Sequence, residues 1–314
     1  MRMFIKDHIR LVKRRDLDAG KWNSCISNDP NGVIYGRTFF LDAVAKNWDG
    51  LVLNDYEAVM PLVWNQKYGL QYLYQPFFTN ALGIFCKNAE AELVSRFLQS
   101  IPRKDVYWDI ALKESNCFQN ITAGRPLKIT TRANHLLPLF DAYPAIFRGY
   151  ARSAKRMVRK AAAAGMYIER QVAIPEVIRA YIAEYDSKVG GLAADAYERI
   201  EASALEAEKR GMAEGYYVRF PDGRIAAFLV LFKDERYLYT VLGGATEQGK
   251  QHGAFYQLID AIIRDHSGAD RILRFEGSDL PGAAQFFMKF GAEKISYFRI
   301  IMNQLPLLIR WLKK

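Results

Sequence analysis

A faint internal repeat constrains the fold of this 314-residue chain more than any other feature of its sequence. In the first half, the apolar run 58–64 is followed, after a polar turn, by the aromatic segment 72–74. In the second half, the apolar run 225–232 is followed in the same way by the segment 237–239. Apolar and aromatic runs that flank short polar turns predict a β-hairpin in each half. Because a repeat decides architecture before local propensity does, we expect two similar structural units.

The elements after each hairpin keep the same order. A helix and then a strand follow in both halves, with the strands expected over 106–110 and 271–276. Helices between the two copies are expected over 143–164, 175–187 and 195–210. We therefore predict an α/β protein with a mixed α+β sheet, made of one unit over 1–130 and a second over 131–314. Two unrelated α/β domains that share this order by chance are the alternative.

The composition is that of an ordinary globular protein. Half of the residues are apolar, and 44 Lys and Arg against 34 Asp and Glu give a net charge of +10. Cys25, Cys86 and Cys117 show neither the spacing of a zinc site nor the even number of a disulfide framework. No segment reads as a signal peptide, and none reaches the ~20 apolar residues of a membrane span. We therefore expect a cytoplasmic protein without a transmembrane segment and without a metal.

Glycines lie between the predicted strand 237–241 and a predicted helix that follows it. Such a segment directs backbone N–H groups and the positive end of a helix dipole at one place, which favours a bound phosphate. It has neither the Lys-Ser/Thr pair of a Walker loop nor the glycine spacing of a dinucleotide fingerprint. The candidate cofactor-binding residues are Leu242, Gly243, Gly244, Gln248, Gly249, Lys250, Gly253 and Ala254.

This segment resembles the acyl-CoA pyrophosphate loop of the GNAT acetyltransferase superfamily, which reads Gln/Arg-x-x-Gly/Ala-x-Gly/Ala. Gln248 and Gly253 fit that pattern, whereas Gln251 occupies the first small-residue position. A side chain at that position narrows the approach of a pyrophosphate.

Two other segments are similar to the FemAB-like branch of the superfamily. One is the Phe-Glu-Gly-Ser run at 275–278 with the Phe-rich run 285–292, and the other is the basic segment 147–161 at the start of the second unit. The resemblance implies a fold of two tandem GNAT-like units packed side by side. It also implies that the protein transfers an acyl group to an amine.

The resemblance leaves three functions open. The first is N-acyl transfer from acyl-CoA, such as acetyl-CoA, to an amine acceptor. The second is FemAB-type transfer from aminoacyl-tRNA to a peptidoglycan precursor, although the predicted helix 195–210 is short for the helical arm of such enzymes. The third is a non-catalytic module that binds a polyanion or a glycan on a degenerate GNAT fold.

Acyl transfer to an amine needs a polarised carbonyl group and a group that removes a proton. Backbone N–H groups over 242–245 are candidates for polarising the carbonyl group, provided that this strand separates from the neighbouring strand. Glu276, at the end of a predicted strand, is the candidate base, and its alternative roles are capping a helix or pairing with an arginine. Tyr297 is the candidate acid, and packing in the last strand is its alternative.

Basic residues without an acidic one fill the segment 144–160. Their 4-3-4 spacing places one set on a single face of a predicted helix, which attracts polyanions such as tRNA or CoA phosphates. A solvated positive face is the alternative. The candidate polyanion-binding residues are Arg148, Arg152, Lys155 and Arg159.

The C-terminal segment 305–314 combines apolar bulk, a tryptophan and basic residues. Such a segment can contact an anionic membrane surface near a lipid-linked substrate. Docking onto the protein's own core is the alternative at this short length.

Overall fold

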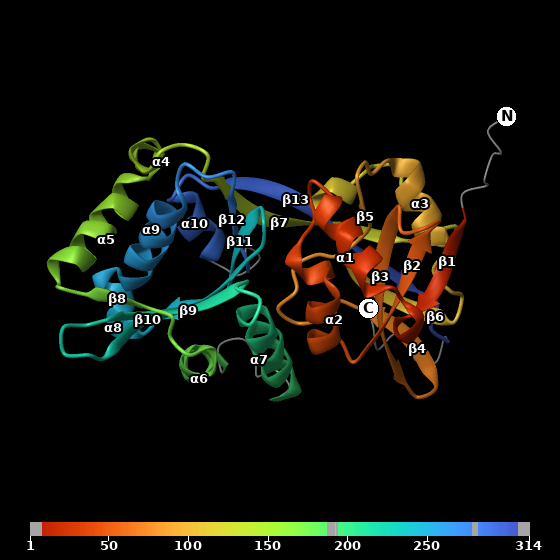
Figure 1. Ribbon diagram of the computed structural model, residues 1–314, viewed down its shortest axis with the longest axis horizontal. Coiled ribbons are helices and arrows are strands. Elements are labelled where there is room, and N and C mark those ends of the chain that lie inside the picture. The colour runs from red at the N-terminus through yellow and green to blue at the C-terminus, as the bar shows by residue number, and fades with distance from the viewer. Residues whose placement is uncertain (1–7, 187–191, 193, 278–281, 307–314) are drawn as a thin grey trace. The chain divides into compact units, whose positions relative to one another are not determined.

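The structure is a computed structural model that describes residues 8–186, 192, 194–277 and 282–306 (Figure 1). The chain divides into two compact units, of which the first comprises Met1–Arg132 and Ser296–Lys314 and the second Ala133–Ile295. Strands β7 (Lys128–Pro138) and β13 (Glu293–Asn303) each contribute residues to both units. The chain therefore returns to the first unit at its end. The boundary between the two repeated units, expected at residue 130, stays a prediction.

The first unit is built on a mixed sheet whose strands lie in the order β1-β2-β3-β4-β6-β13. Neighbouring strands run antiparallel, except that β4 and β6 are parallel. The first predicted hairpin is confirmed as β3 and β4. The strands are β1 (Ile9–Lys13), β2 (Asn47–Leu53), β3 (Ala58–Lys67), β4 (Leu70–Tyr74), β5 (Phe85–Cys86) and β6 (Asp105–Leu112). The helices are η1 (Arg14–Asp16), α1 (Ala19–Asn28), η2 (Ile34–Gly36), α2 (Thr38–Val44), α3 (Ala91–Gln99) and η3 (Glu114–Asn116).

Helices pack on both faces of this sheet. Phe97 of α3 is fully buried in a core with Leu51 of β2, and its burial contributes about 1.5–3 kcal/mol. Gly50, the next residue of β2, points to the other face because successive strand residues alternate. A Cβ on Gly50 would lie 2.5 Å from the ring of Trp22. The glycine therefore lets α1 pack closely on the face opposite α3.

The second unit is built on a mixed sheet whose strands lie in the order β7-β12-β11-β10-β9-β8. Only β11 and β12 are parallel among the described pairs of this sheet. The second predicted hairpin is confirmed as β10 and β11. The strands are β8 (Tyr167–Arg170), β9 (Ala213–Arg219), β10 (Ile225–Lys233), β11 (Tyr237–Ala245) and β12 (Ile272–Phe275). The helices are α4 (Tyr143–Gly149), α5 (Arg152–Ala163), α6 (Ile174–Tyr185), α7 (Ala194–Glu208), α8 (Glu247–His252), α9 (Ala254–His266) and α10 (Ala283–Met288).

Helices also cover both faces of the second sheet. Figure 1 shows α5 and α9 on one side of β8–β11 and α6 and α7 on the other. Leu258 of α9 shares a core with Leu238 of β11. On the other face, the ring of Phe228 lies 6.4 and 6.1 Å from the rings of Tyr181 and Tyr185 of α6. The predicted α/β class with a mixed sheet in two units of similar element order is therefore confirmed.

The single helix predicted over 143–164 is wrong in its middle, where α4 ends and α5 begins. Tyr150 and Ala151 between them have extended backbone, with ψ of 142° and 150°. The break turns the Tyr150 ring into the core, 5.0 Å from the ring of Phe290. Tertiary packing here overrides local helix propensity. As a result, Arg148 lies on α4, apart from the other basic residues of α5.

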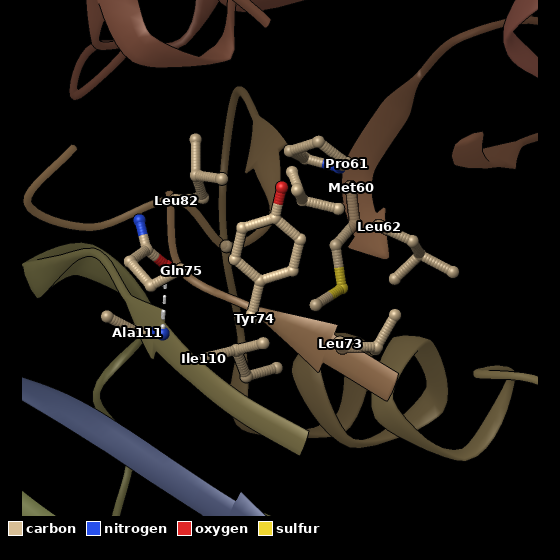
Figure 2. Close-up of a pocket in the computed structure, with 11 residues that line it drawn as sticks. Met60, Pro61, Leu62, Leu73, Tyr74, Gln75, Leu82, Ile110 and Ala111 are labelled. Atoms are coloured by element: carbon tan, nitrogen blue, oxygen red, sulfur yellow. Dashed lines mark hydrogen bonds between the residues drawn. The ribbon is translucent and has the colours of Figure 1, made fainter. Parts of the chain in front are cut away.

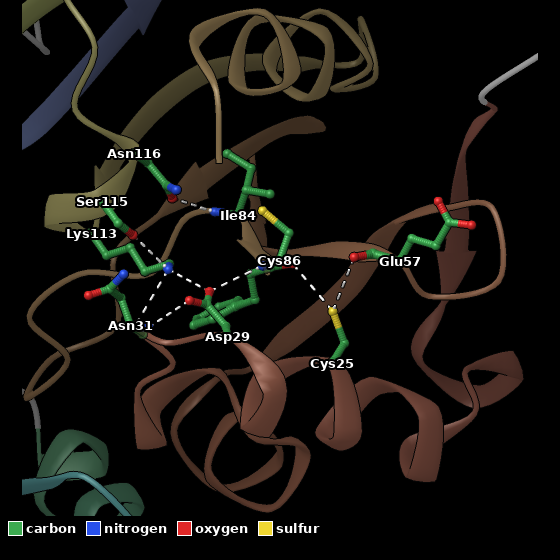
Figure 3. A network of polar contacts seen from close by, with 10 residues as sticks. Cys25, Asp29, Asn31, Glu57, Ile84, Cys86, Lys113, Ser115 and Asn116 are labelled. Carbon is green, nitrogen blue, oxygen red and sulfur yellow. Dashed lines mark hydrogen bonds and ion pairs between the residues drawn. The ribbon is translucent and has the colours of Figure 1, made fainter. Parts of the chain in front are cut away.

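A buried ion pair holds three segments of the first unit together (Figure 3). Lys113 Nζ lies 2.6 Å from Asp29 Oδ2, and both side chains are 2% exposed. Asp29 ends α1, and its carboxylate also accepts the backbone N–H of Cys86 in β5 at 3.1 Å. Lys113 follows β6 and donates to Ser115 Oγ at 2.8 Å. The pair therefore ties the end of α1 to β5 and to the segment after β6.

We expect Lys113→Met to lower the free energy of unfolding by about 3–5 kcal/mol, because it leaves the Asp29 carboxylate buried without its cation. Urea unfolding of the full chain measures this change. The double variant Asp29→Asn, Lys113→Met removes both charges and should recover part of the loss. Equal stability of the single and double variants would contradict this account.

Candidate active site

The candidate site lies where β11 and β12 stop pairing. The last pair of these parallel strands is Thr240 with Phe275, and β12 ends there. β11 continues beside β10 as far as Ala245. Its pairing with β10 shifts register at Val241, which is the extra residue of a β-bulge. A bulge bends and twists its strand, and here β11 keeps its pairing with β10 beyond the point at which its pairing with β12 ends.

The backbone N–H groups of β11 alternate between the two sides of the strand. Thr246 N, just after the strand, donates to Ala226 O of β10 at 3.0 Å. Ala245 N faces the other side, where it donates to the hydroxyl of Tyr185 at 3.3 Å. Gly243, two residues earlier, has the same orientation as Ala245. Its N–H therefore points to the side on which β12 has ended, which we call the β11–β12 opening.

The glycine-bearing segment between β11 and the next long helix contains a short helix of its own. Leu242, Gly243 and Gly244 belong to β11 itself, and Ala254 begins α9. Between them lies α8, which contains Gln248, Gly249 and Lys250, and the left-handed residue Gly253 that separates α8 from α9.

Backbone N–H groups of this segment donate to acceptors of the protein. Gly249 N donates to Thr246 Oγ1 at 3.1 Å, which caps α8. Lys250 N donates to Thr246 O at 2.9 Å, and Gly253 N to Lys250 O at 3.2 Å. A pyrophosphate cradle requires N–H groups directed at the ligand. These three groups are already used within the segment.

Close packing accounts for two of the glycines. A Cβ on Gly249 would lie 1.9 Å from Ala226 O, so only glycine lets α8 approach β10. Gly253 has a φ of 80°, in the left-handed region that glycine adopts without strain. A Cβ there would also lie 2.6 Å from Met157 O of α5. A bulky residue at 253 therefore disturbs the fold as well as any ligand.

Side chains of α8 are engaged as well. Gln248 Oε1 accepts a hydrogen bond from Arg224 Nη1 at 2.9 Å. Lys250 Nζ donates to Glu247 at 3.2 Å and lies 5.6 Å from the centre of the Tyr185 ring. Three backbone N–H groups and two side chains of the segment that was predicted to bind a pyrophosphate are thus used within the protein. The binding of a cofactor by this segment stays a prediction.

Glu276 directly follows the last paired residue of β12 and therefore lies at the β11–β12 opening. Its Oε1 is 3.7 Å from Nε of Arg274, and the two side chains are 8% and 2% exposed. The Arg274 guanidinium lies 5.1 and 6.0 Å from the ring centres of Tyr237 and Tyr239. The Tyr239 hydroxyl donates to Asp234, whose pKa is raised by burial. The carboxylate predicted as a base is thus held by a buried arginine.

Tyr297 lies in the part of β13 that belongs to the first unit. It is buried in a small cluster with Ala81 and Ala111. Glu276 and the residues of α8 belong to the second unit. The role of Tyr297 as an acid stays a prediction.

Within the described ranges, no group of His, Cys, Asp or Glu side chains could hold a metal ion. None of the helices in the same ranges is long and apolar enough to cross a membrane. Ser278 of the Phe-Glu-Gly-Ser run lies outside the described residues. The same holds for residues 307–314, which are most of the C-terminal segment expected to contact a membrane surface.

Helix α5 presents a basic face. Ala154, Val158 and Ala161 are buried against the core, so the residues on the other side of the helix face solvent. Lys155 is half-buried and donates to Arg148 O of α4 at 2.9 Å. The exposed basic residues of α5 are Arg152, Arg156, Arg159 and Lys160.

Tyr185 of α6 lies near the candidate site but was not predicted from the sequence as a site residue. Its hydroxyl contacts Ala245, and its ring would collide with a Cβ on Gly244 at 2.4 Å. The sequence shows only that Tyr181 and Tyr185 are four residues apart on a predicted helix, so that their side chains share one face. In the structure their rings stack with centres 5.4 Å apart. That pattern alone is typical of a packed helix face.

The first unit has an equivalent junction, which is closed (Figure 2). Parallel pairing of β4 with β6 ends at Tyr74 with Asp109. Gln75, the next residue after β4, contacts β6 through its side chain, whose Oε1 accepts the backbone N–H of Ala111 at 3.2 Å. The remaining pocket beside Leu73 has a volume of about 10 Å³, room for one water molecule. A donor group therefore has no space at this junction.

Comparisons with known proteins bear on the family and the fold. Residues 148–279 match the family model of the acetyltransferase (GNAT) domain. The crystal structure of FemX is similar, with a TM-score of 0.69 and 14% identity over 97% of this chain and 100% of that chain. A search of curated proteins gives no significant match.

Two further solved structures share the fold. One is the C-terminal domain of a putative lysylphosphatidylglycerol synthetase from Agrobacterium fabrum, with a TM-score of 0.56 and 12% identity over 94% of this chain and 93% of that one. The other is a tandem GNAT protein from the clavulanic acid biosynthesis pathway, with a TM-score of 0.51 and 12% identity over 94% of this chain and 98% of that one. Residues 148–279 are therefore a GNAT acetyltransferase domain, and the whole chain shares the fold of FemX and of the tandem GNAT protein.

We expect Gly249→Ala to destabilise the second unit by about 1–3 kcal/mol, because the added methyl group forces α8 away from β10. Urea unfolding of the full chain measures the change. Gly149→Ala is the matched control, since no atom lies within 4 Å of a Cβ at that position and its φ is not positive. An equal loss of stability in the two variants would contradict the claim that the contact between Gly249 and Ala226 requires glycine.

Proposed function

We propose that this protein transfers an aminoacyl group from aminoacyl-tRNA to an amine of a cell-wall precursor. The acyl group occupies the β11–β12 opening of the second unit. The observation that carries this choice of donor is the closure of the α8 segment, whose N–H groups at Gly249, Lys250 and Gly253 donate within the protein. CoA needs a pyrophosphate cradle near its thioester, whereas the phosphates of a tRNA can be bound elsewhere.

The basic face of α5 supports an RNA-borne donor. It carries Arg152, Arg156, Arg159 and Lys160 within about two turns, and α5 contains no acidic residue. Cations at this density bind phosphate backbones and release their counterions. The face lies in the same unit as the β11–β12 opening.

The chemistry follows from the groups at the opening. The acceptor amine attacks the ester carbonyl carbon, a C–N bond forms, and the C–O bond to the terminal ribose breaks. Gly243 N–H donates to the carbonyl oxygen as negative charge develops there, which stabilises the transition state. Glu276 accepts the proton of the amine, and the ribose oxygen leaves as a hydroxyl after taking up a proton. Arg274 holds the Glu276 carboxylate at the end of β12.

Transfer from acyl-CoA is the second candidate. The divergence of β11 from β12 after Thr240 supports it, because an open strand edge suits a thin thioester arm. The closed α8 segment weakens it. Transfer from either donor would use the same polarising N–H and the same carboxylate.

Binding measurements distinguish the two donors. We expect a pool of aminoacyl-tRNA to bind the full chain saturably at 50 mM salt, and acetyl-CoA not to bind in isothermal titration. In the presence of a lysine-containing peptide, the protein should release free tRNA from the aminoacyl ester. Saturable acetyl-CoA binding without tRNA binding would contradict the proposal and favour the second candidate.

A triple variant, Arg152→Gln, Arg156→Gln, Arg159→Gln, tests the basic face. Loss of three phosphate contacts should reduce the slope of log Kd against log salt by about 2–3. Lys209→Gln, Arg210→Gln is the control, because both of these cations pair with Glu206. An unchanged slope in the triple variant would remove α5 from the RNA site.

A further inference from the structure

The first unit contains a surface pocket that the proposed transfer reaction does not use. It has a volume of about 480 Å³, within the range of roughly 300–1,000 Å³ for small-molecule sites. It lies at the edge of the sheet, between β1 with η1, the end of α2, the start of β2 and β3. Two tryptophans, Trp48 and Trp64, are part of its wall. We call it the Trp64 pocket.

The acceptor atoms of the pocket are already engaged. Asp49, whose side chain is 8% exposed, accepts from Lys13 Nζ at 2.7 Å, from Arg14 N at 3.2 Å and from Trp64 Nε1 at 3.2 Å. Asp42 accepts from Nε and Nη2 of Arg14, each at 2.7 Å, and from Trp48 Nε1 at 2.9 Å. A carboxylate has about four acceptor positions, so each aspartate has little capacity left for a ligand donor.

Donor groups, by contrast, exceed the acceptors. Lys13 Nζ has three N–H groups and gives one to Asp49, and Arg14 has five and gives two of its side-chain donors to Asp42. The lining contains four cations, Lys13, Arg14, Arg15 and Lys46, and two anions, so 4 − 2 gives a charge of +2. Just outside it, Lys104 beside Trp64 adds one cation and Asp16 beside Arg15 adds one anion, so the sum stays +2. The pocket therefore selects an anion, and its charge matches a dianion better than a monoanion.

The indole of Trp64 adds a flat apolar surface beside these cations. Its ring is half-buried, and Lys13 Nζ and Lys104 Nζ each lie 5.9 Å from its centre. An anionic group bound by Lys13 would therefore lie near the indole. A planar ring attached to that group can then pack on the apolar wall.

We infer that the Trp64 pocket binds a phosphomonoester carried on a planar ring. A phosphomonoester carries a charge of about −1.5 to −2 at neutral pH, which balances the charge of the lining, whereas a carboxylate or a phosphodiester carries only one charge. Free nucleoside monophosphates and aryl phosphates share this chemistry. This inference does not depend on the proposed function, because no residue of the pocket takes part in the transfer.

Isothermal titration of the full chain tests the ligand class. The probes are uridine 5′-monophosphate and phenyl phosphate, with uridine, inorganic phosphate and the methyl ester of uridine 5′-monophosphate as comparisons. We expect at least one of the first two to bind saturably and at least tenfold more tightly than the comparisons. The one that binds identifies a nucleotide or an aryl phosphate as the source. The inference is overturned if neither binds, or if the methyl ester binds as tightly as its parent.

The pH dependence gives a second readout. The phosphate loses its second proton near pH 6, so affinity should rise between pH 5 and 7.5 as the dianion forms. The charged groups that face the site are the four cations and two aspartates of the lining, Lys104, and Asp16, which lies 3.5 Å from Arg15. None of them is a histidine. A flat profile would contradict recognition of a dianion.

Variants place the ligand in the pocket. Arg15→Gln removes the charge of a side chain that is 86% exposed. Trp64→Leu removes the flat indole surface. Each should weaken binding at least fivefold, and both leave the Lys13 to Asp49 pair intact. Lys87→Gln, an exposed cation outside the lining, should leave binding unchanged. Equal affinity in all three variants would assign the binding to another place.

Discussion

The β-bulge at Val241 is the constraint on which the candidate site depends. Across the bulge, β11 keeps its pairing with β10 as far as Ala245, whereas its pairing with β12 ends at Thr240. A backbone donor faces the place where Glu276 follows the end of β12. The fold thus supplies a polarising group and a carboxylate from neighbouring strands.

The packing around α8 determines which donor suits this site. Gly249 brings α8 against β10, and Gly253 brings the start of α9 against α5. These contacts stabilise the unit, and the cap at Thr246 uses an N–H group that a phosphate cradle would need. The basic face of α5 offers phosphate-binding capacity in a different part of the same unit. The first unit, in which Gln75 closes the corresponding junction, offers no second donor site there.

The sequence predicted the features that follow from local patterns. Both hairpins could be found because apolar runs and polar turns recur, and the basic segment could be found because it lacks acidic residues. The bulge could not be found, since it is a property of the pairing between β10 and β11. The break at Tyr150 also escaped prediction, because it depends on the core position of Phe290. Tyr185 lies near the site only through the packing of α6 on β11.

The glycines illustrate the same limit. A strand, a glycine-bearing segment and a helix fit a phosphate loop, and the sequence alone does not distinguish that loop from a capped helix. The distinction rests on Thr246 Oγ1, which accepts the Gly249 N–H, and on the contact of Gly249 with Ala226. Both depend on how α8 packs on β10.

The central claim is that the acyl group of the donor lies in the β11–β12 opening. Its most direct test is an NMR titration of the ¹⁵N-glycine-labelled full chain with a non-hydrolysable aminoacyl-nucleoside amide. We predict a saturable shift of the Gly243 amide resonance, with Gly223 in the turn before β10 unchanged. Binding that shifts Gly249 and Gly253 but leaves Gly243 unmoved would contradict the claim and place the donor on α8.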